Sequence, residues 1–246
     1  MTLAGKISVS THYTRSINVE RDQSQLDVVK SYVPTSRALR TLQRIVDAFS
    51  DDQHPRAWSL IGPYGSGKSA FGIYVRGLLA PADSDLGKAA RNSLRSVSPA
   101  LATAFEQQAQ ETEGYLPVMV SGSPEPLSQR LVAAMSAAAY LRWGEKPGPN
   151  PAIVEKLEEA SKQSSIPASV VIDLFDELVS KLERQKGVIR GGVILVIDEL
   201  GKFLEYEAHH YGANDIYILQ ALAEYACDSG PSKVLVFALL HQSFEQ

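Results

Sequence analysis

Apolar and polar residues follow two patterns along this chain, one typical of amphipathic helices and one typical of buried strands. Residues 35–49, "TSRALRTLQRIVDAF", place apolar residues at spacings of three and four, which predicts a helix capped by Thr35 or Ser36. Residues 169–185, "SVVIDLFDELVSKLERQ", repeat this spacing, and we interpret their apolar stripe as core packing. Further helices are predicted over 69–79, within 80–114, over 127–143 and around 214–227.

Four short apolar runs predict strands. They are "AWSLIG" at 57–62, "YLPVMVSG" at 115–122, "GGVILVIDEL" at 191–200 and "KVLVFALLHQ" at 233–242. The first is interpreted as a short buried strand, and the third is continuous and aliphatic, as in strands buried on both faces. Because the strands alternate with helices, the sequence predicts an α/β fold with a parallel sheet.

These patterns divide the chain into two regions. Residues 1–34 are polar and irregular, with one short strand candidate at "SINVE", and are interpreted as an N-terminal extension or linker. Residues 35–246 form the predicted α/β core. Within it, about 121–190 separates the second and third strands by more than one crossover needs, which predicts a helical insertion and a surface for a partner.

Composition and charge narrow the class of protein. The 246 residues are 44% hydrophobic with a net charge of −4, which gives no support for a whole-chain electrostatic grip on nucleic acid. The longest apolar run, "VLVFALL", is far shorter than the ~20 residues of a membrane span. The start of the chain lacks the apolar core of a secretory signal, and the one cysteine, Cys227, cannot form an internal disulfide. We therefore expect a cytoplasmic protein with no membrane partner.

Candidate chemistry begins at residues 62–69, "GPYGSGKS", which fit G-x-x-x-x-G-K-[ST] at every fixed position. Glycines let backbone N–H groups approach phosphate oxygens, and the helix that starts near Lys68 adds its positive dipole end. Lys68 is predicted to reach the β- and γ-phosphates of a nucleotide, and the Ser69 hydroxyl to ligate Mg²⁺. The predicted nucleotide-binding residues are Gly62, Tyr64, Gly65, Ser66, Gly67, Lys68, Ser69 and Ala70.

Two adjacent carboxylates follow the third predicted strand, in "VILVIDEL". Asp198 is predicted to hold the Mg²⁺ shell, and Glu199 to orient and polarise the attacking water. The carboxyl ends of parallel strands are also where an α/β sheet opens its ligand crevice. The two segments together predict a magnesium-dependent nucleotide site.

The pair "GPYGSGKS" and "VILVIDEL" resembles the Walker A and Walker B motifs of P-loop NTPases. The glutamate directly after the aspartate is similar to the additional-strand catalytic-glutamate branch, which contains the AAA+ and STAND proteins. Over roughly residues 30–246 the resemblance implies a three-layer fold with a mainly parallel sheet, ATP and Mg²⁺ as ligands, and ATP hydrolysis. It also implies a polar sensor at the end of the fourth strand, for which "VLVFALLHQSFE" offers Gln242 or, as a weaker match, His241.

The rest of the sequence has one further similarity to known ATPases and one departure from the AAA+ pattern. The segment "IDELGKFLEYEA" resembles segments of large bacterial ATPases of defence or DNA-processing systems. The AAA+ pattern continues after the sensor with a fifth strand, an arginine finger and a helical lid, whereas this sequence stops at Gln246. We expect a fragment of a longer protein that acts through self-association or within a larger complex. Since an arginine finger in trans is worth roughly 10³–10⁵ in rate, slow hydrolysis is expected from the chain alone.

Other nucleotide-dependent functions use the same loop. A nucleotide-gated switch or scaffold that binds ATP with little turnover stays open as the main alternative. "DELG" at 198–201 fits the D-x-x-G of GTPases, but no N/T-K-x-D string for guanine selection occurs. A small-molecule kinase would not need Glu199 at its position, the L-S-G-G-Q signature of ABC transporters is absent, and "DELG" is a poor match to DEAD-type helicases.

The remaining polar features have simpler interpretations. The adjacent histidines at 209–210 lack the i, i+4 spacing of helical metal ligands. Arg37, Arg40 and Arg44 are interpreted as a solvated helix face, with a phosphate or partner contact as the alternative. Residues 32–37, "YVPTSR", are predicted to flank adenine. This prediction rests only on analogy with the N-terminal linker of AAA+ proteins.

Overall fold

The computed structural model describes residues 16–50, 53–144, 151–183, 191–210, 215–229 and 234–241. In these ranges the strands β1 (Ala57–Gly62), β2 (Leu116–Ser121), β3 (Val193–Asp198) and β4 (Val234–His241) form one parallel sheet in the order β1-β4-β3-β2. The predicted α/β fold with a parallel sheet is therefore confirmed. The helices are α1 Val19–Asp22, α2 Leu26–Ser31, α3 Ser36–Ser50, α4 Lys68–Leu78, α5 Asp85–Val97, α6 Pro99–Glu111, α7 Leu127–Ala139, the π-helical turn η3 Tyr140–Gly144, α8 Ala152–Ser161, α9 Ala168–Glu183, α10 Leu200–His209 and α11 Asp215–Asp228.

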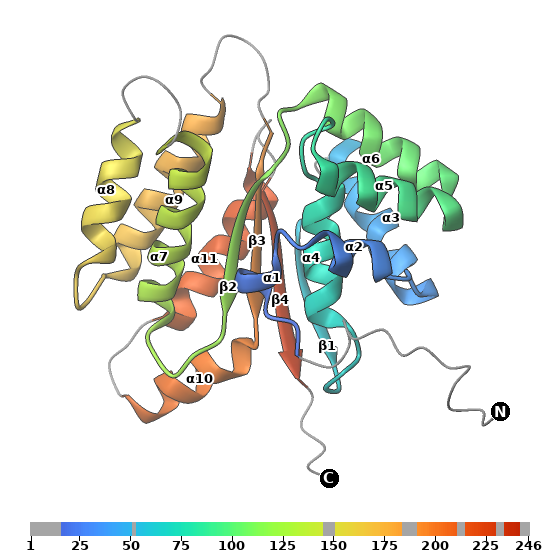
Figure 1. Cartoon of the computed structure of the whole chain (residues 1–246). Helices are drawn as coiled ribbons and strands as arrows, with labels where there is room; N and C mark the ends of the chain where they lie inside the picture. Colours follow the sequence, from blue (N-terminus) through green and yellow to red (C-terminus); the bar gives the residue numbers. More distant parts are fainter. Residues whose placement is uncertain are drawn as a thin grey trace, which may run out of the picture.

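Helices cover both faces of the sheet (Figure 1). The side chains of β3 alternate between two cores, because successive residues of a strand point to opposite faces. Val193, Leu195 and Ile197 pack with α7, α8, α9 and α11, whereas Ile194 and Val196 pack with the helices α1 to α6. Every residue of β3 is buried, so the prediction of a strand covered on both faces is confirmed.

The prediction that 57–62 is a buried strand is only half right. β1 is a strand, but among the described residues it pairs with β4 alone and lies at the edge of the sheet. Its exposed positions include Ser59 and Ile61, and the Ile61 residue is 58% exposed. The apolar run was too short to distinguish an edge strand from a central one.

The predicted strand at "SINVE" is wrong, because this segment starts a helix. The Asn18 side chain accepts hydrogen bonds from the backbone N–H groups of Glu20 and Arg21, at 3.0 and 2.9 Å. Asparagine is among the best helix N-caps, so this local chemistry favours α1 over an extended backbone. Val19 in α1 and Val29 in α2 are completely buried, so the described part of the N-terminal extension packs on the core.

The described residues between β2 and β3 are largely helical, as predicted. The helices α7, α8 and α9 bury Leu131, Leu157 and Phe175 against one face of the sheet. This segment therefore builds a layer of the core. No helix in the part of the chain that the structure describes is long and apolar enough to cross a lipid bilayer.

Helix α4 follows the glycine-rich loop after β1, and its C-terminal end is held by Arg91 of α5. The buried guanidinium donates hydrogen bonds to the carbonyls of Leu78, Ala80, Pro81 and Ala82, at 3.0–3.2 Å. The last carbonyls of a helix have no partner within the helix. Arg91 therefore satisfies the end of α4 and fixes its position on the core.

We expect Arg91→Met to lower the free energy of unfolding by about 3 kcal/mol, since it leaves buried carbonyls without a donor. The measurement is urea denaturation followed by circular dichroism. Arg95→Met is the matched control, because Arg95 lies one turn further along α5 in a half-exposed pair with Glu106 and should change stability by less than about 1 kcal/mol. Equal effects of the two substitutions would contradict the capping role of Arg91.

Candidate functional site

The loop between β1 and α4 has the backbone geometry of an anion cradle. Gly65 and Gly67 have positive φ values of 74° and 84°, a region that side-chain-bearing residues rarely adopt. A Cβ atom on either glycine would project into open space, with no atom within 4 Å. Gly67 is the N-cap residue of α4, so the free N–H groups of the helix start lie beside the loop.

A cavity of about 600 Å³ lies against this loop. Its lining combines residues 64–70 with Ser121, Asp198, Glu199 and His241, which stand at or just after the ends of β2, β3 and β4. Segment 16–18 and Arg21 complete the wall. The structure thus brings both predicted motifs to one cavity at the carboxyl edge of the sheet, where a ligand crevice is expected.

The Lys68 ammonium is bound to the loop itself. Its Nζ donates to the carbonyl oxygens of Gly62 (2.7 Å) and Pro63 (2.9 Å) and to Ser66 Oγ (3.3 Å), and lies 3.1 Å from His241 Nδ1. Burial lowers the pKa of Lys68, and the nearby Asp198 charge opposes this shift. The partners of the ammonium are neutral groups, so an anion in the cavity would be a stronger partner than any of them.

Asp198 and Ser69, the two predicted metal ligands, line the same cavity. Asp198 Oδ1 accepts the backbone N–H of Glu199 at 2.9 Å. Asp198 is only 3% exposed, and burial raises its pKa, although the Ser69 hydroxyl and the Glu199 N–H favour the charged form. A nearby cation would reverse that shift.

The cavity offers few other side chains that could bind a divalent cation. Ser121 Oγ is buried and has no hydrogen-bond partner among the described residues. No group of three or more His, Cys, Asp or Glu residues that could hold a metal occurs in the described ranges. A divalent cation between Ser69 and Asp198 would therefore need oxygen ligands from water or a bound anion, which is how Mg²⁺ is usually held.

Glu199 occupies a strained backbone position. Its φ and ψ of 51° and 41° place it in the left-handed region, unlike any other described non-glycine residue. Its backbone lies against Gly122, where a Cβ atom would come within 2.3 Å of the Glu199 carbonyl oxygen. The carboxylate contacts Lys202 Nζ at 2.6 Å and lies 3.8 Å from His241 Nε2. Strain of this kind is common where a side chain must be aimed at a site.

His241, the weaker match for the polar sensor, lies inside the cavity wall. Its ring stacks on Tyr64 with 3.7 Å between centroids, and its two nitrogens face Lys68 and Glu199. Burial and the Lys68 charge lower its pKa, so the neutral imidazole can accept a hydrogen bond from the ammonium. Gln242, the preferred sensor, lies outside the described residues and stays a prediction.

A second cavity, of about 320 Å³, borders the other side of the loop and includes Gly62, Ser66, Gly67 and Lys68 in its lining. Segment 32–37, predicted to flank adenine, contributes to its wall with Tyr32, Thr35 and Arg37. Arg37, Arg40 and Arg44 are exposed, as the solvated-face interpretation requires, but Arg37 and Arg44 also line this cavity.

Four of the cavity's polar residues, Ser16, Asn18, Arg21 and Ser121, were not predicted from the sequence. Ser121 could have been found, because it ends a predicted strand and the ends of parallel strands share one edge. The sequence contains no signal for Ser16, Asn18 and Arg21, because the approach of this segment to the loop depends on tertiary packing.

No family model, curated protein or solved structure matches this chain. The chemistry of the cavity must therefore be inferred from its own residues. One wall offers loop amides, an ammonium and a hydroxyl, and the facing wall offers two carboxylates and an imidazole. Such a set suits a polyphosphate with a divalent cation.

We expect the left-handed backbone of Glu199 to reduce the stability of the fold. Glu199→Gly should raise the free energy of unfolding by about 1 kcal/mol relative to Glu199→Ala, because only glycine adopts this backbone without strain. Both variants lack the carboxylate, so their difference isolates the backbone. A glycine variant that is no more stable than the alanine variant, in urea denaturation, would contradict the strain.

Proposed function

We propose that this chain binds ATP with Mg²⁺ and hydrolyses it to ADP and phosphate, as a cytoplasmic module that drives remodelling or assembly of a larger complex. The observation that carries the proposal is the single cavity in which the glycine loop and Lys68 face Asp198 and Glu199. Ser69 and Asp198 come from different motifs and line this same cavity, which adds support.

The strand order supports placement in the AAA+/STAND-like branch of P-loop NTPases. β4 follows β3 in the sequence but lies between β3 and β1 in the sheet. An additional strand at this position carries its terminal residue, His241, between the loop and the acidic pair. The resemblance of the two motifs and the order of the strands are independent observations, and both favour the same branch.

In the proposed complex, the polyphosphate replaces the partners that Lys68 has in the loop. The ammonium then leaves the carbonyls of Gly62 and Pro63 and contacts the β- and γ-phosphates, while the N–H groups at the start of α4 bind the remaining oxygens. Ser69 and Asp198 would hold Mg²⁺, which when bound supplies neutralisation of the phosphate charge. The adenine base would enter the second cavity, beside Tyr32 and Arg37.

Hydrolysis requires a water placed by Glu199. In the proposed step the carboxylate accepts a proton from this water, whose oxygen forms a bond to the γ-phosphorus. The bond from the γ-phosphorus to the bridging oxygen breaks, and ADP leaves with its electron pair. His241 lies between Lys68 and Glu199 and would sense which phosphates are present.

The alternative, a switch or scaffold that binds ATP with little turnover, is favoured by one observation. Glu199 Oε2 is engaged with Lys202 at 2.6 Å, and the carboxylate must leave this pair before it can orient a water. A partner chain or a second copy could control that release. Slow turnover by the chain alone agrees with both functions.

Two substitutions separate binding from hydrolysis. We expect Lys68→Ala to weaken Mg·ATP binding about tenfold or more, since a charged hydrogen-bond donor to phosphate is lost. Glu199→Gln should leave Mg·ATP binding within about twofold. It should reduce turnover by about 10²-fold or more, because the glutamine amide cannot accept a proton from the attacking water. Calorimetry and phosphate release measure the two effects.

Lys88→Ala, an exposed change on α5 away from the cavity, is the control. ATP binding that survives Lys68→Ala unchanged would overturn the proposed site. Turnover that survives Glu199→Gln would exclude the assigned base, and a wild-type chain that binds ATP without any turnover would favour the switch.

A further inference from the structure

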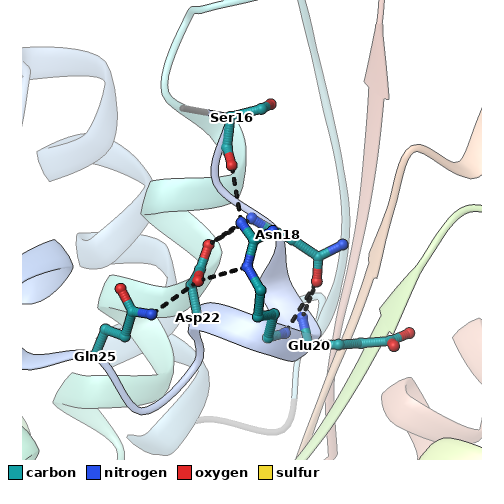
Figure 2. Close-up of polar contacts among 6 residues, drawn as sticks. Ser16, Asn18, Glu20, Asp22 and Gln25 are labelled. Atoms are coloured by element: carbon teal, nitrogen blue, oxygen red, sulfur yellow. Dashed lines mark hydrogen bonds and ion pairs between the residues drawn. The ribbon is translucent and has the colours of Figure 1, made fainter. Parts of the chain in front are cut away.

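One wall of the phosphate cavity belongs to neither motif. The N-terminal segment contributes Ser16, Ile17, Asn18 and Arg21 to its lining. Figure 2 shows Ser16, Asn18, Asp22 and Gln25 gathered in one polar network around α1. The network therefore lies next to the proposed nucleotide.

The network fixes the guanidinium of Arg21. Arg21 Nε and Nη2 donate to the two oxygens of Asp22 at 2.9 and 2.8 Å, a bidentate pair, and Nη2 also donates to the Ser16 carbonyl at 3.1 Å. Asp22 is 1% exposed and accepts further bonds from Asn18 N and Gln25 Nε2, each at 3.0 Å. A guanidinium held by a buried, saturated carboxylate has little freedom left to lose on binding an anion.

Part of the same guanidinium remains available. Arg21 Nη1 carries two N–H groups and has no hydrogen-bond partner among the described residues. The Arg21 side chain is 52% exposed although its partner Asp22 is buried, and Arg21 is one of the residues that line the cavity. These are the groups that would reach a ligand oxygen.

The segment itself is anchored to the sheet by Glu20, whose side chain points away from the network (Figure 2). Glu20 Oε1 accepts the backbone N–H of Ser121 at 2.7 Å and also binds the guanidinium of Arg130 on α7. α1 therefore rests on the carboxyl end of β2, at the opposite edge of the sheet from β1. Arg21 lines the cavity from this segment, which packs on both β2 and α4.

We propose that Arg21 contacts the terminal phosphate of a bound nucleoside triphosphate, as an arginine supplied by the chain itself. This inference rests on the proposed function, and it deepens it by assigning a third cation to the same site. Guanidinium matches phosphate geometry bidentately, and an arginine at the terminal phosphate stabilises the charge that develops during transfer. Lys68 and Arg21 line one cavity but belong to different elements, so we expect a nucleoside triphosphate to contact both.

The test compares triphosphate and diphosphate binding by calorimetry, with the full chain and the non-hydrolysable Mg·AMPPNP against Mg·ADP. Arg21→Ala should weaken AMPPNP about tenfold or more and change ADP by less than about twofold. Arg95→Ala, an exposed arginine in a surface ion pair away from the cavity, should change neither. If Arg21→Ala lowers the melting temperature by more than about 5 °C, Arg21→Gln takes its place with the same expected loss of triphosphate preference, because glutamine keeps a donor for Asp22 but no charge.

The outcomes separate this inference from the function on which it rests. If the wild type binds both nucleotides and Lys68→Ala weakens them, but the arginine variant leaves AMPPNP unchanged or weakens ADP equally, Arg21 has a structural role only and the inference is overturned. If the wild type binds neither nucleotide, the proposed function fails first and the inference with it.

Discussion

The parallel pairing of β1, β4 and β3 is the constraint on which the whole site depends, because it brings three strand ends to one edge of the sheet. The register places Gly62 opposite His241, and Ser121 of β2 opposite Asp198 of β3. Since neighbouring strands lie about 5 Å apart, residues from positions more than a hundred apart in sequence share one cavity. A change in the position of β4 would separate the glycine loop from the acidic pair and leave two unrelated features.

The cavity contains several buried charged or polar groups that the protein itself stabilises only in part. Asp198 is buried and its pKa is raised, the pKa of Lys68 is lowered by the same desolvation, and Ser121 Oγ is buried without a partner in the described structure. Each deficiency would be relieved by a phosphate or by a cation between oxygens. Glu199 adds backbone strain at the same place. Groups of this kind gather at functional sites because the fold elsewhere is stable enough to hold them.

Local patterns in the sequence predicted much of this arrangement. The strand with "VILVID", the α3 stripe with Thr35 as its cap, and the positions of Lys68 and Asp198 follow from periodicity and from a motif whose spacing reflects backbone geometry. The failures depended on tertiary context. "AWSLIG" reads the same whether it lies at an edge or in the centre of a sheet, and "SINVE" became a helix because Asn18 caps it and Val19 finds a core. Arg21 lies at the cavity through tertiary contacts of its segment, among them those of Glu20 with β2 and α7 across more than a hundred residues.

The central claim is that Lys68 exchanges its bonds within the loop for a polyphosphate held between the glycine loop and the acidic pair. A crystal structure of the chain with Mg·AMPPNP tests it most directly. The account predicts that Lys68 Nζ leaves the Gly62 and Pro63 carbonyls for the β- and γ-phosphates, with the metal beside Ser69 and Asp198. A nucleotide bound elsewhere, or a Lys68 that keeps its bonds to the loop with nucleotide present, would contradict it.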